Sequence, residues 1–170
     1  TAQEEVTFPK EDIRFDNGDM QLTINIRTGL VDHYTAAGVE YVSNGAFAPV
    51  LYQDSPDPWY MTKNCFPQKF GVFALTEARR AHRYSDGAEI LVPAVRIVEN
   101  GAVRMLVEAE FIWGRSRLVQ TYCLPKAGTS FEIMQDIFWN EADTMLKLEI
   151  PAAFKGDYLG QGMFGSGSLP

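Results

Sequence analysis

Apolar and polar residues alternate with a period of two through residues 103–113, with Leu106 and Ile112 as apolar exceptions. Two runs rich in β-forming residues flank a Glu-Asn-Gly turn at 99–101, and Asn-Gly readily takes the positive φ values of a two-residue hairpin loop. After the turn, every second residue from Val103 to Trp113 is apolar, whereas Arg104, Glu108 and Glu110 point the other way. One apolar face is typical of a sheet packed on one side. We therefore expect an antiparallel hairpin with these two glutamates on its solvated face.

The same alternation predicts strands along most of the chain. They are expected at residues 21–28, 30–34 and 39–42, and again at 90–98, 102–113, 116–124, 130–139 and 145–151. In the strand at 116–124, the inward set is either Val119, Thr121 and Cys123 or Leu118, Tyr122 and Leu124, and apolar residues on both faces suggest a strand covered on both sides. Turn signals every 8–12 residues predict an all-β fold, an antiparallel β-sandwich.

The remaining segments lack this alternation. Residues 43–71 contain four prolines and are expected to be loop, because proline is excluded from central strands. Residues 75–85 carry a thin apolar stripe and are expected to hold at most one short helix. Residues 1–12 are polar and expected to be flexible. The 170 residues are predicted to form a single domain.

Composition narrows the classes of partner. The formal net charge of −7 disfavours a nucleic-acid partner, because phosphate neutralisation needs a basic surface. No apolar run is long enough to span a membrane and no signal peptide is recognisable, so no membrane partner is expected. The compartment stays open, with a soluble cytoplasmic protein favoured. Cys65 and Cys123 are expected to be free thiols.

The ends of the chain suggest an excised piece of a longer protein. It begins at Thr1 without a methionine, and it stops just after a glycine-rich run at 160–167. We expect residues 160–170 to be a truncated end, although a mature chain with a flexible tail is the alternative.

Catalytic and metal-binding patterns are not recognisable. His33 and His82 are too far apart in sequence to form a local ligand pair, and there is no Cys-x-x-Cys or Gly-x-Ser-x-Gly motif. The glycines at 160, 162 and 165 match a phosphate-binding pattern by letters, without the βαβ context that it requires. We predict no catalytic residue and no metal ligand in this chain.

One loop has the composition of a sugar site. Residues 52–61 (Tyr-Gln-Asp-Ser-Pro-Asp-Pro-Trp-Tyr-Met) combine acids with aromatic side chains. Carboxylates accept hydrogen bonds from hydroxyl groups, and an indole packs on the apolar face of a pyranose ring. Asp57 and Trp59 are the candidates for this role. The alternative is that Trp59 fills a gap at the edge of the sandwich.

Several segments together carry a family resemblance. They are residues 17–35, 57–61 (Asp-Pro-Trp-Tyr-Met), 99–104 (Glu-Asn-Gly-Ala-Val-Arg), 116–124 (Ser-Arg-Leu-Val-Gln-Thr-Tyr-Cys-Leu), 139–141 (Trp-Asn-Glu) and 146–151 (Leu-Lys-Leu-Glu-Ile-Pro). In this order they resemble the β-sandwich region that follows the catalytic domain in α-mannosidases of glycoside hydrolase family 38. The resemblance covers roughly residues 15–165.

The resemblance implies a galactose mutarotase-like, or supersandwich, fold and a non-catalytic role. In that family the nucleophile and the zinc or other divalent metal belong to a separate catalytic domain, so none of these is transferred to this chain. The implied partners are that catalytic domain and a carbohydrate. Candidate sugar contacts are Asp57, Trp59, Tyr158 and Gln161, although Tyr60 stands where a small or polar residue is expected.

Two other functions remain open from the sequence. The chain could instead be a stand-alone carbohydrate-binding or mutarotase-like module that uses the loop at 57–61. A purely structural interaction domain is the third reading, and it would expose an apolar patch without any affinity for sugar.

Overall fold

A computed structural model describes residues 9–56, 68–82, 86–157 and 159–168. This part of the chain contains sixteen β-strands and no helix. The strands are β1 (Ile13–Asp16), β2 (Met20–Ile24), β3 (Val31–Ala36), β4 (Val39–Glu40), β5 (Ala48–Gln53), β6 (Lys69–Val72), β7 (Ala74–Leu75), β8 (Arg79–His82), β9 (Glu89–Val92), β10 (Val95–Asn100), β11 (Arg104–Trp113), β12 (Ser116–Pro125), β13 (Glu132–Phe138), β14 (Thr144–Glu149), β15 (Leu159–Gly162) and β16 (Gly165–Ser168). No helix that could cross a membrane is found in the described ranges.

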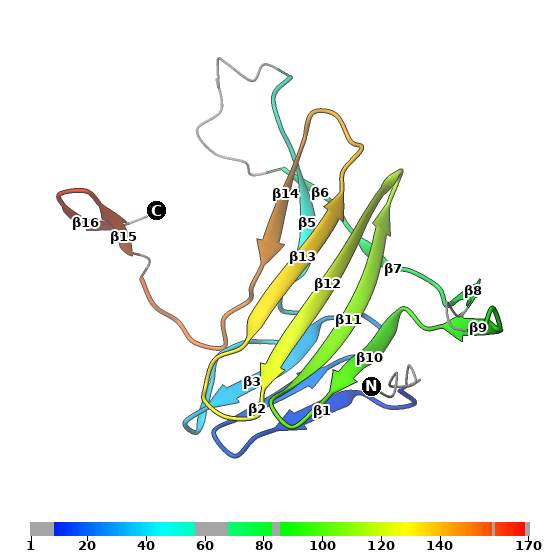
Figure 1. The fold of residues 1–170 in the computed structure, drawn as a ribbon. Helices are drawn as coiled ribbons and strands as arrows, with labels where there is room; N and C mark the ends of the chain where they lie inside the picture. The colour runs from blue at the N-terminus through cyan, green and yellow to red at the C-terminus, as the bar shows by residue number, and fades with distance from the viewer. Residues whose placement is uncertain (1–8, 57–67, 83–85, 158, 169–170) are drawn as a thin grey trace.

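The strands form three main antiparallel sheets and two separate hairpins (Figure 1). The first sheet has the order β1-β2-β3-β4, and the central sheet has the order β10-β11-β12-β13 with β7 beside β11. A third sheet runs β14-β5-β6, while β8-β9 and β15-β16 pair only with each other. The all-β, antiparallel sandwich predicted from the alternation is confirmed.

The hydrophobic core lies between the first sheet and the central sheet. The first sheet contributes Leu22, Ile24 and Val31, and the central sheet contributes Val107, Phe111, Leu118, Tyr122 and Leu124, all at most 1% exposed. On β12 the inward set is therefore the one with Leu118, Tyr122 and Leu124. On β11 the predicted apolar face is buried from Met105 to Phe111, and Trp113 is half-buried.

The predicted hairpin exists, but its turn lies two residues later than expected. Asn100 still pairs with Met105, and the Gly101 amide donates to the carbonyl of Arg104 at 2.9 Å. Ala102 and Val103 therefore form the turn, and neither Asn100 nor Gly101 has a positive φ. A bulge between Ile97 and Glu99 shifts the register and moves the turn along the chain.

At most one short helix was expected at 75–85, and the described part of this segment holds none, only the end of β7 and β8. Two other predictions about elements are wrong. The strand expected at 90–98 is two strands, because Pro93 and Ala94 separate β9 from β10. The loop expected at 43–71 contains β5, the central strand of the third sheet; Pro49 is accommodated because its carbonyl still accepts the Phe73 amide at 2.9 Å.

Candidate functional site

The segment with the sequence Ser-x-Leu-x-Gln-x-Tyr points three polar side chains into the sandwich. Ser116, Gln120 and Tyr122 are on the inner face of β12 and are at most 1% exposed. Gln120 donates from its Nε2 to the Tyr122 hydroxyl at 2.6 Å and to the Phe47 carbonyl at 3.2 Å, and its Oε1 accepts from Gln135 at 2.6 Å. These polar groups are thus satisfied internally, and their role is to join strands.

The same network reaches the first sheet. The Tyr122 hydroxyl donates to the carbonyl of Gly29 at 2.8 Å. Gly29 has φ +71°, and a Cβ there would lie 2.7 Å from Leu75 Cδ1 and 2.9 Å from Phe111 Cζ. Glycine is required at this point because a side chain would be strained by the backbone and would also overlap the core.

Two segments that carry the family resemblance, residues 116–124 and 139–141, meet at the turn between β11 and β12. Glu141 Oε1 accepts from the Ser116 hydroxyl at 2.9 Å and from the Arg115 amide at 3.2 Å. The Ser116 hydroxyl oxygen in turn accepts the Asn140 amide at 2.8 Å. The Trp-Asn-Glu segment at 139–141 therefore binds to this end of the central sheet. The Glu141 carboxylate stabilises the turn between β11 and β12.

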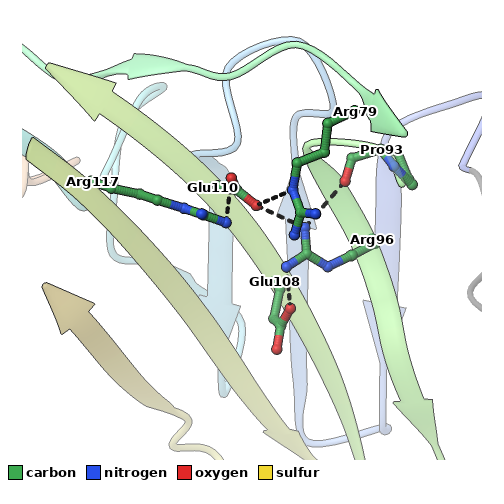
Figure 2. A network of polar contacts seen from close by, with 6 residues as sticks. All are labelled: Arg79, Pro93, Arg96, Glu108, Glu110 and Arg117. Atoms are coloured by element: carbon green, nitrogen blue, oxygen red, sulfur yellow. Dashed lines mark hydrogen bonds and ion pairs between the residues drawn. The ribbon is translucent and has the colours of Figure 1, made fainter. Parts of the chain in front are cut away.

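Glu110 lies at the centre of an ionic network on the outer face of the central sheet (Figure 2). Its carboxylate contacts Arg117 at 2.6 Å, Arg96 at 3.4 Å and Arg79 at 3.7 Å. Arg96 also bonds Glu108 at 2.6 Å. Glu110 is only 4% exposed, so the expectation of a solvated face is wrong for this residue.

A distant segment explains the burial of Glu110. The Thr76 amide donates to the Glu110 carbonyl at 2.8 Å, and the Glu110 amide donates to the Ala94 carbonyl at 3.0 Å. Residues near β7 and before β10 thus flank β11 at this point, and Arg79 on β8 covers the carboxylate. Three arginines against Glu108 and Glu110 leave the cluster with one excess positive charge, in a chain whose net charge is −7.

The predicted sugar loop emerges from the end of the third sheet. Its candidates Asp57 and Trp59 lie outside the described residues, but the base of the loop is described. The Gln53 amide donates to the Gln68 carbonyl at 3.1 Å, and the Asp54 amide donates to the Asp143 carbonyl at 2.9 Å. Backbone hydrogen bonds therefore fix both ends of this segment to the β14-β5-β6 sheet.

Aromatic side chains surround the same base. Trp113 packs on Gly71, where a Cβ would lie 2.7 Å from its ring, and its ring centroid is 6.1 Å from that of Phe70. Lys147 lies over the Tyr52 ring at 4.7 Å. Phe70 is the most exposed of these three rings, at 51%.

The fourth candidate, Gln161, lies on the β15-β16 hairpin, and Tyr158 lies outside the described residues. Gln161 is exposed and pairs across the hairpin with Ser166. Figure 1 shows this hairpin standing away from the three sheets at the end of a long connection. The described residues do not bring Gln161 against the base of the sugar loop.

His33 and His82 are exposed, and Cys123 on β12 is partly buried. His33 Nδ1 is 3.9 Å from Glu40, and the His82 ring contacts the Gly87 carbonyl at 3.2 Å. Cys123 is a free thiol, as predicted, while Cys65 lies outside the described residues. Within the described ranges, no group of three or more His, Cys, Asp or Glu side chains could hold a metal ion.

The network of Glu110 was missed by the sequence analysis. Its only sequence signal is the set of arginines at 79, 96 and 117, and nothing local shows that they converge on one strand. Tyr122 belongs to one of the two inward sets proposed for the strand at 116–124, whereas Gln120, which lies on the same face, was in neither set.

Comparison with known proteins agrees with this architecture. No curated protein sequence matches the chain. The family model described as "Glycosyl hydrolases family 38 C-terminal domain" matches residues 15–161, which run from β1 into β15 and include every strand of the three sheets except the first two residues of β1. This match covers well over half of the chain, and we conclude that the chain belongs to the family of glycosyl hydrolase family 38 C-terminal domains.

Proposed function

We propose that this domain is the non-catalytic sandwich of an α-mannosidase-type glycosyl hydrolase. It packs on the catalytic domain and supplies part of the wall of the sugar pocket. The observation that carries the proposal is the anchored base of residues 54–68, which joins a loop of sugar-binding composition to a sheet by backbone bonds at both ends. Binding residues are disproportionately found on loops that a rigid scaffold such as this sheet positions.

Each candidate residue has a distinct role in this proposal. The Asp57 carboxylate accepts hydrogen bonds from sugar hydroxyls, and the Trp59 indole packs on the apolar face of the ring. Tyr158 and Gln161 supply further hydrogen bonds from the β15-β16 side. The reacting carboxylates and the zinc or other divalent metal belong to the catalytic domain, and the described residues offer no group to hold that metal.

The first test is activity. The 170-residue chain alone, incubated with 4-nitrophenyl α-mannoside and zinc chloride, should release no nitrophenol. Zinc-dependent turnover by this chain would refute a non-catalytic role.

The second test uses the full-length glycosidase. Trp59→Ala should raise KM for the aryl mannoside about fivefold or more, because one stacking contact is worth about 1–3 kcal/mol. Phe138→Ala is the matched control, since Phe138 is 67% exposed on the outer face of β13 and should leave KM unchanged. An unchanged KM in Trp59→Ala would remove Trp59 from the pocket wall.

The alternative function has its own signature. Millimolar or tighter binding of mannose, galactose or an oligosaccharide by the chain alone, lost in Trp59→Ala, would identify a stand-alone carbohydrate-binding module. Absence of binding to the isolated chain favours a pocket that is completed only by the catalytic domain.

A further inference from the structure

Three Asn-Gly dipeptides lie in this chain, at residues 17–18, 44–45 and 100–101. Asparagine is a thermolabile residue. The backbone nitrogen of the following residue can attack its side-chain carbonyl carbon, and a following glycine presents no side chain to hinder the attack. The chemistry is the same at all three dipeptides, so the surroundings of each asparagine decide where the folded chain reacts.

The side chain of Asn17 is held at both of its polar atoms. Its Oδ1 accepts the amides of Asp19 and Met20 at 2.9 and 2.8 Å. Its Nδ2 donates to the carbonyls of Pro125 and Gly128 at 2.9 and 3.0 Å. These four hydrogen bonds tie the turn between β1 and β2 to the end of β12 and the connection that follows it. The side-chain carbonyl carbon cannot turn towards the next backbone nitrogen until they break.

Asn100 is also held, but by fewer recorded bonds. Its Oδ1 accepts from Lys126 Nζ at 2.8 Å at an exposed position. The Gly101 amide, which must lose its proton before it can attack, donates to the Arg104 carbonyl at 2.9 Å. Both reacting groups of this dipeptide therefore have partners, which slows the reaction.

Asn44 differs from the other two asparagines in the freedom of its side chain. Asn44 is exposed, and its side chain makes no hydrogen bond to any residue that the structure describes. The Gly45 amide does donate to the Asp32 carboxylate at 3.0 Å, but the Gly18 amide donates to Asp16 in the same way at 2.8 Å. An occupied glycine amide is thus common to both dipeptides, and only Asn44 has a side chain that is free to turn.

We propose that Asn44 is the site at which the folded chain is covalently modified, by spontaneous deamidation. The Gly45 nitrogen loses its proton to hydroxide and bonds to the side-chain carbonyl carbon of Asn44. The bond from that carbon to Nδ2 breaks, and ammonia leaves. Water then opens the resulting succinimide ring at either carbonyl, which gives aspartate or isoaspartate. This inference is independent of the proposed function.

The position of Asn44 gives the modification a structural effect. Ala46 and Val31 exchange both backbone hydrogen bonds, at 2.8 and 3.2 Å, which fixes one side of the turn to the first sheet. The Ser43 amide donates to the Pro151 carbonyl at 2.8 Å, which fixes the other side to the segment after β14. Isoaspartate adds one carbon to the backbone between these two fixed points. The isoaspartyl product should therefore be less stable than the unmodified chain.

Peptide mapping by mass spectrometry, after storage of the folded 170-residue chain at mildly alkaline pH, tests the site. Asn44 should deamidate at least about tenfold faster than Asn17, because reaction at Asn17 requires local opening of the fold. Asn100 should react at an intermediate rate. In urea the three rates should agree within about threefold, because the unfolded chain no longer distinguishes them. Equal rates in the folded chain, or a faster rate at Asn17 or Asn100 than at Asn44, would overturn the proposal.

Two substitutions at the same position complete the test. Asn44→Gln should abolish the modification at this position and leave the rate at Asn17 unchanged, because a longer side chain closes the ring far more slowly. Asn44→Asp carries the new charge on an unaltered backbone, so it is the matched control for the isoaspartyl product. The isoaspartyl fraction, isolated by ion-exchange chromatography, should unfold at a lower urea concentration than Asn44→Asp. Equal midpoints would refute the effect of the added backbone carbon.

Discussion

The Tyr122 hydroxyl and the Gly29 carbonyl are joined by a 2.8 Å hydrogen bond that crosses the interior of the sandwich. Tyr122 belongs to β12 in the central sheet, and Gly29 lies in the connection that leads to β3 in the first sheet. The hydroxyl also accepts a hydrogen bond from Gln120 at 2.6 Å. One phenolic oxygen thus ties the two layers together at a point where both partners are buried.

Tyr122→Phe should lower the free energy of unfolding by about 1–3 kcal/mol, because it leaves the Gly29 carbonyl without its donor in a buried position. Urea denaturation measures this loss. Tyr34→Phe is the matched control, since its hydroxyl bonds the Thr129 carbonyl at an exposed position. Equal losses in the two variants would show that burial of the Tyr122 hydrogen bond does not increase its contribution to the free energy of unfolding.

The same tyrosine predicts a dependence on alkaline pH. Burial raises the pKa of Tyr122 above its ordinary value of 10.0. The folded state therefore favours the neutral phenol, and that stability is fully present below about pH 10 and lost as pH rises towards the folded pKa. The stability of the wild-type chain relative to Tyr122→Phe should fall by about 1.4 kcal/mol per pH unit above pH 10. Denaturation curves at pH 8 to 11 test this, and a constant difference would contradict it.

Gly29→Ala should destabilise the fold more than the same change at Gly38. Both glycines have φ near +70°, at +71° and +76°, so the backbone strain of alanine is the same, about 1–2 kcal/mol. At Gly38 a Cβ meets nothing within 4 Å, whereas at Gly29 it overlaps Leu75 and Phe111. Thermal or urea unfolding should show an additional loss of about 1–3 kcal/mol for Gly29→Ala. Similar losses of stability in the two variants would mean that Leu75 and Phe111 can move away from the new methyl group without a loss of stability.

Glu110→Gln should destabilise the chain by about 3 kcal/mol, because it leaves three arginines around a buried site without their shared carboxylate. The value lies at the low end for a buried ion pair, since Arg79 and Arg117 are about half exposed. Glu99→Gln removes a carboxylate that bonds the exposed Arg104 and should have little effect. Urea denaturation of both variants decides the comparison, and a stable Glu110→Gln chain would mean that the arginines are solvated independently.

The sequence predicted those features that depend on neighbouring residues. The period of two on β11 placed Met105, Val107 and Phe111 in the core, because side chains alternate across any strand. The hairpin was also correct, although the bulge at Ile97 and Glu99 moved its turn. Bulges depend on how two strands pair, and no local pattern in residues 97–113 reveals one.

Features that depend on distant segments were not predictable in this way. Glu110 has the pattern of a solvated residue, and only the arrival of Thr76, Arg79 and Ala94 beside β11 buries it. Pro49 argued for a loop, yet its carbonyl still pairs within the third sheet. Among the candidate sugar contacts, only Gln161 lies in the described residues, where it is exposed on a hairpin, and the roles of all four candidates stay predictions.

The order of the layers along the chain has a consequence for biosynthesis. The first sheet is made from residues 13–40, and its facing layer is made from residues 95–138. Gly29 and Tyr122 are 93 residues apart, a separation that a ribosome translates in roughly 5–20 s at about 5–20 residues per second. During that interval Leu22, Ile24 and Val31 have emerged without the layer that covers them. The nascent N-terminal sheet is therefore a natural client for a chaperone that shields apolar strands until β12 arrives.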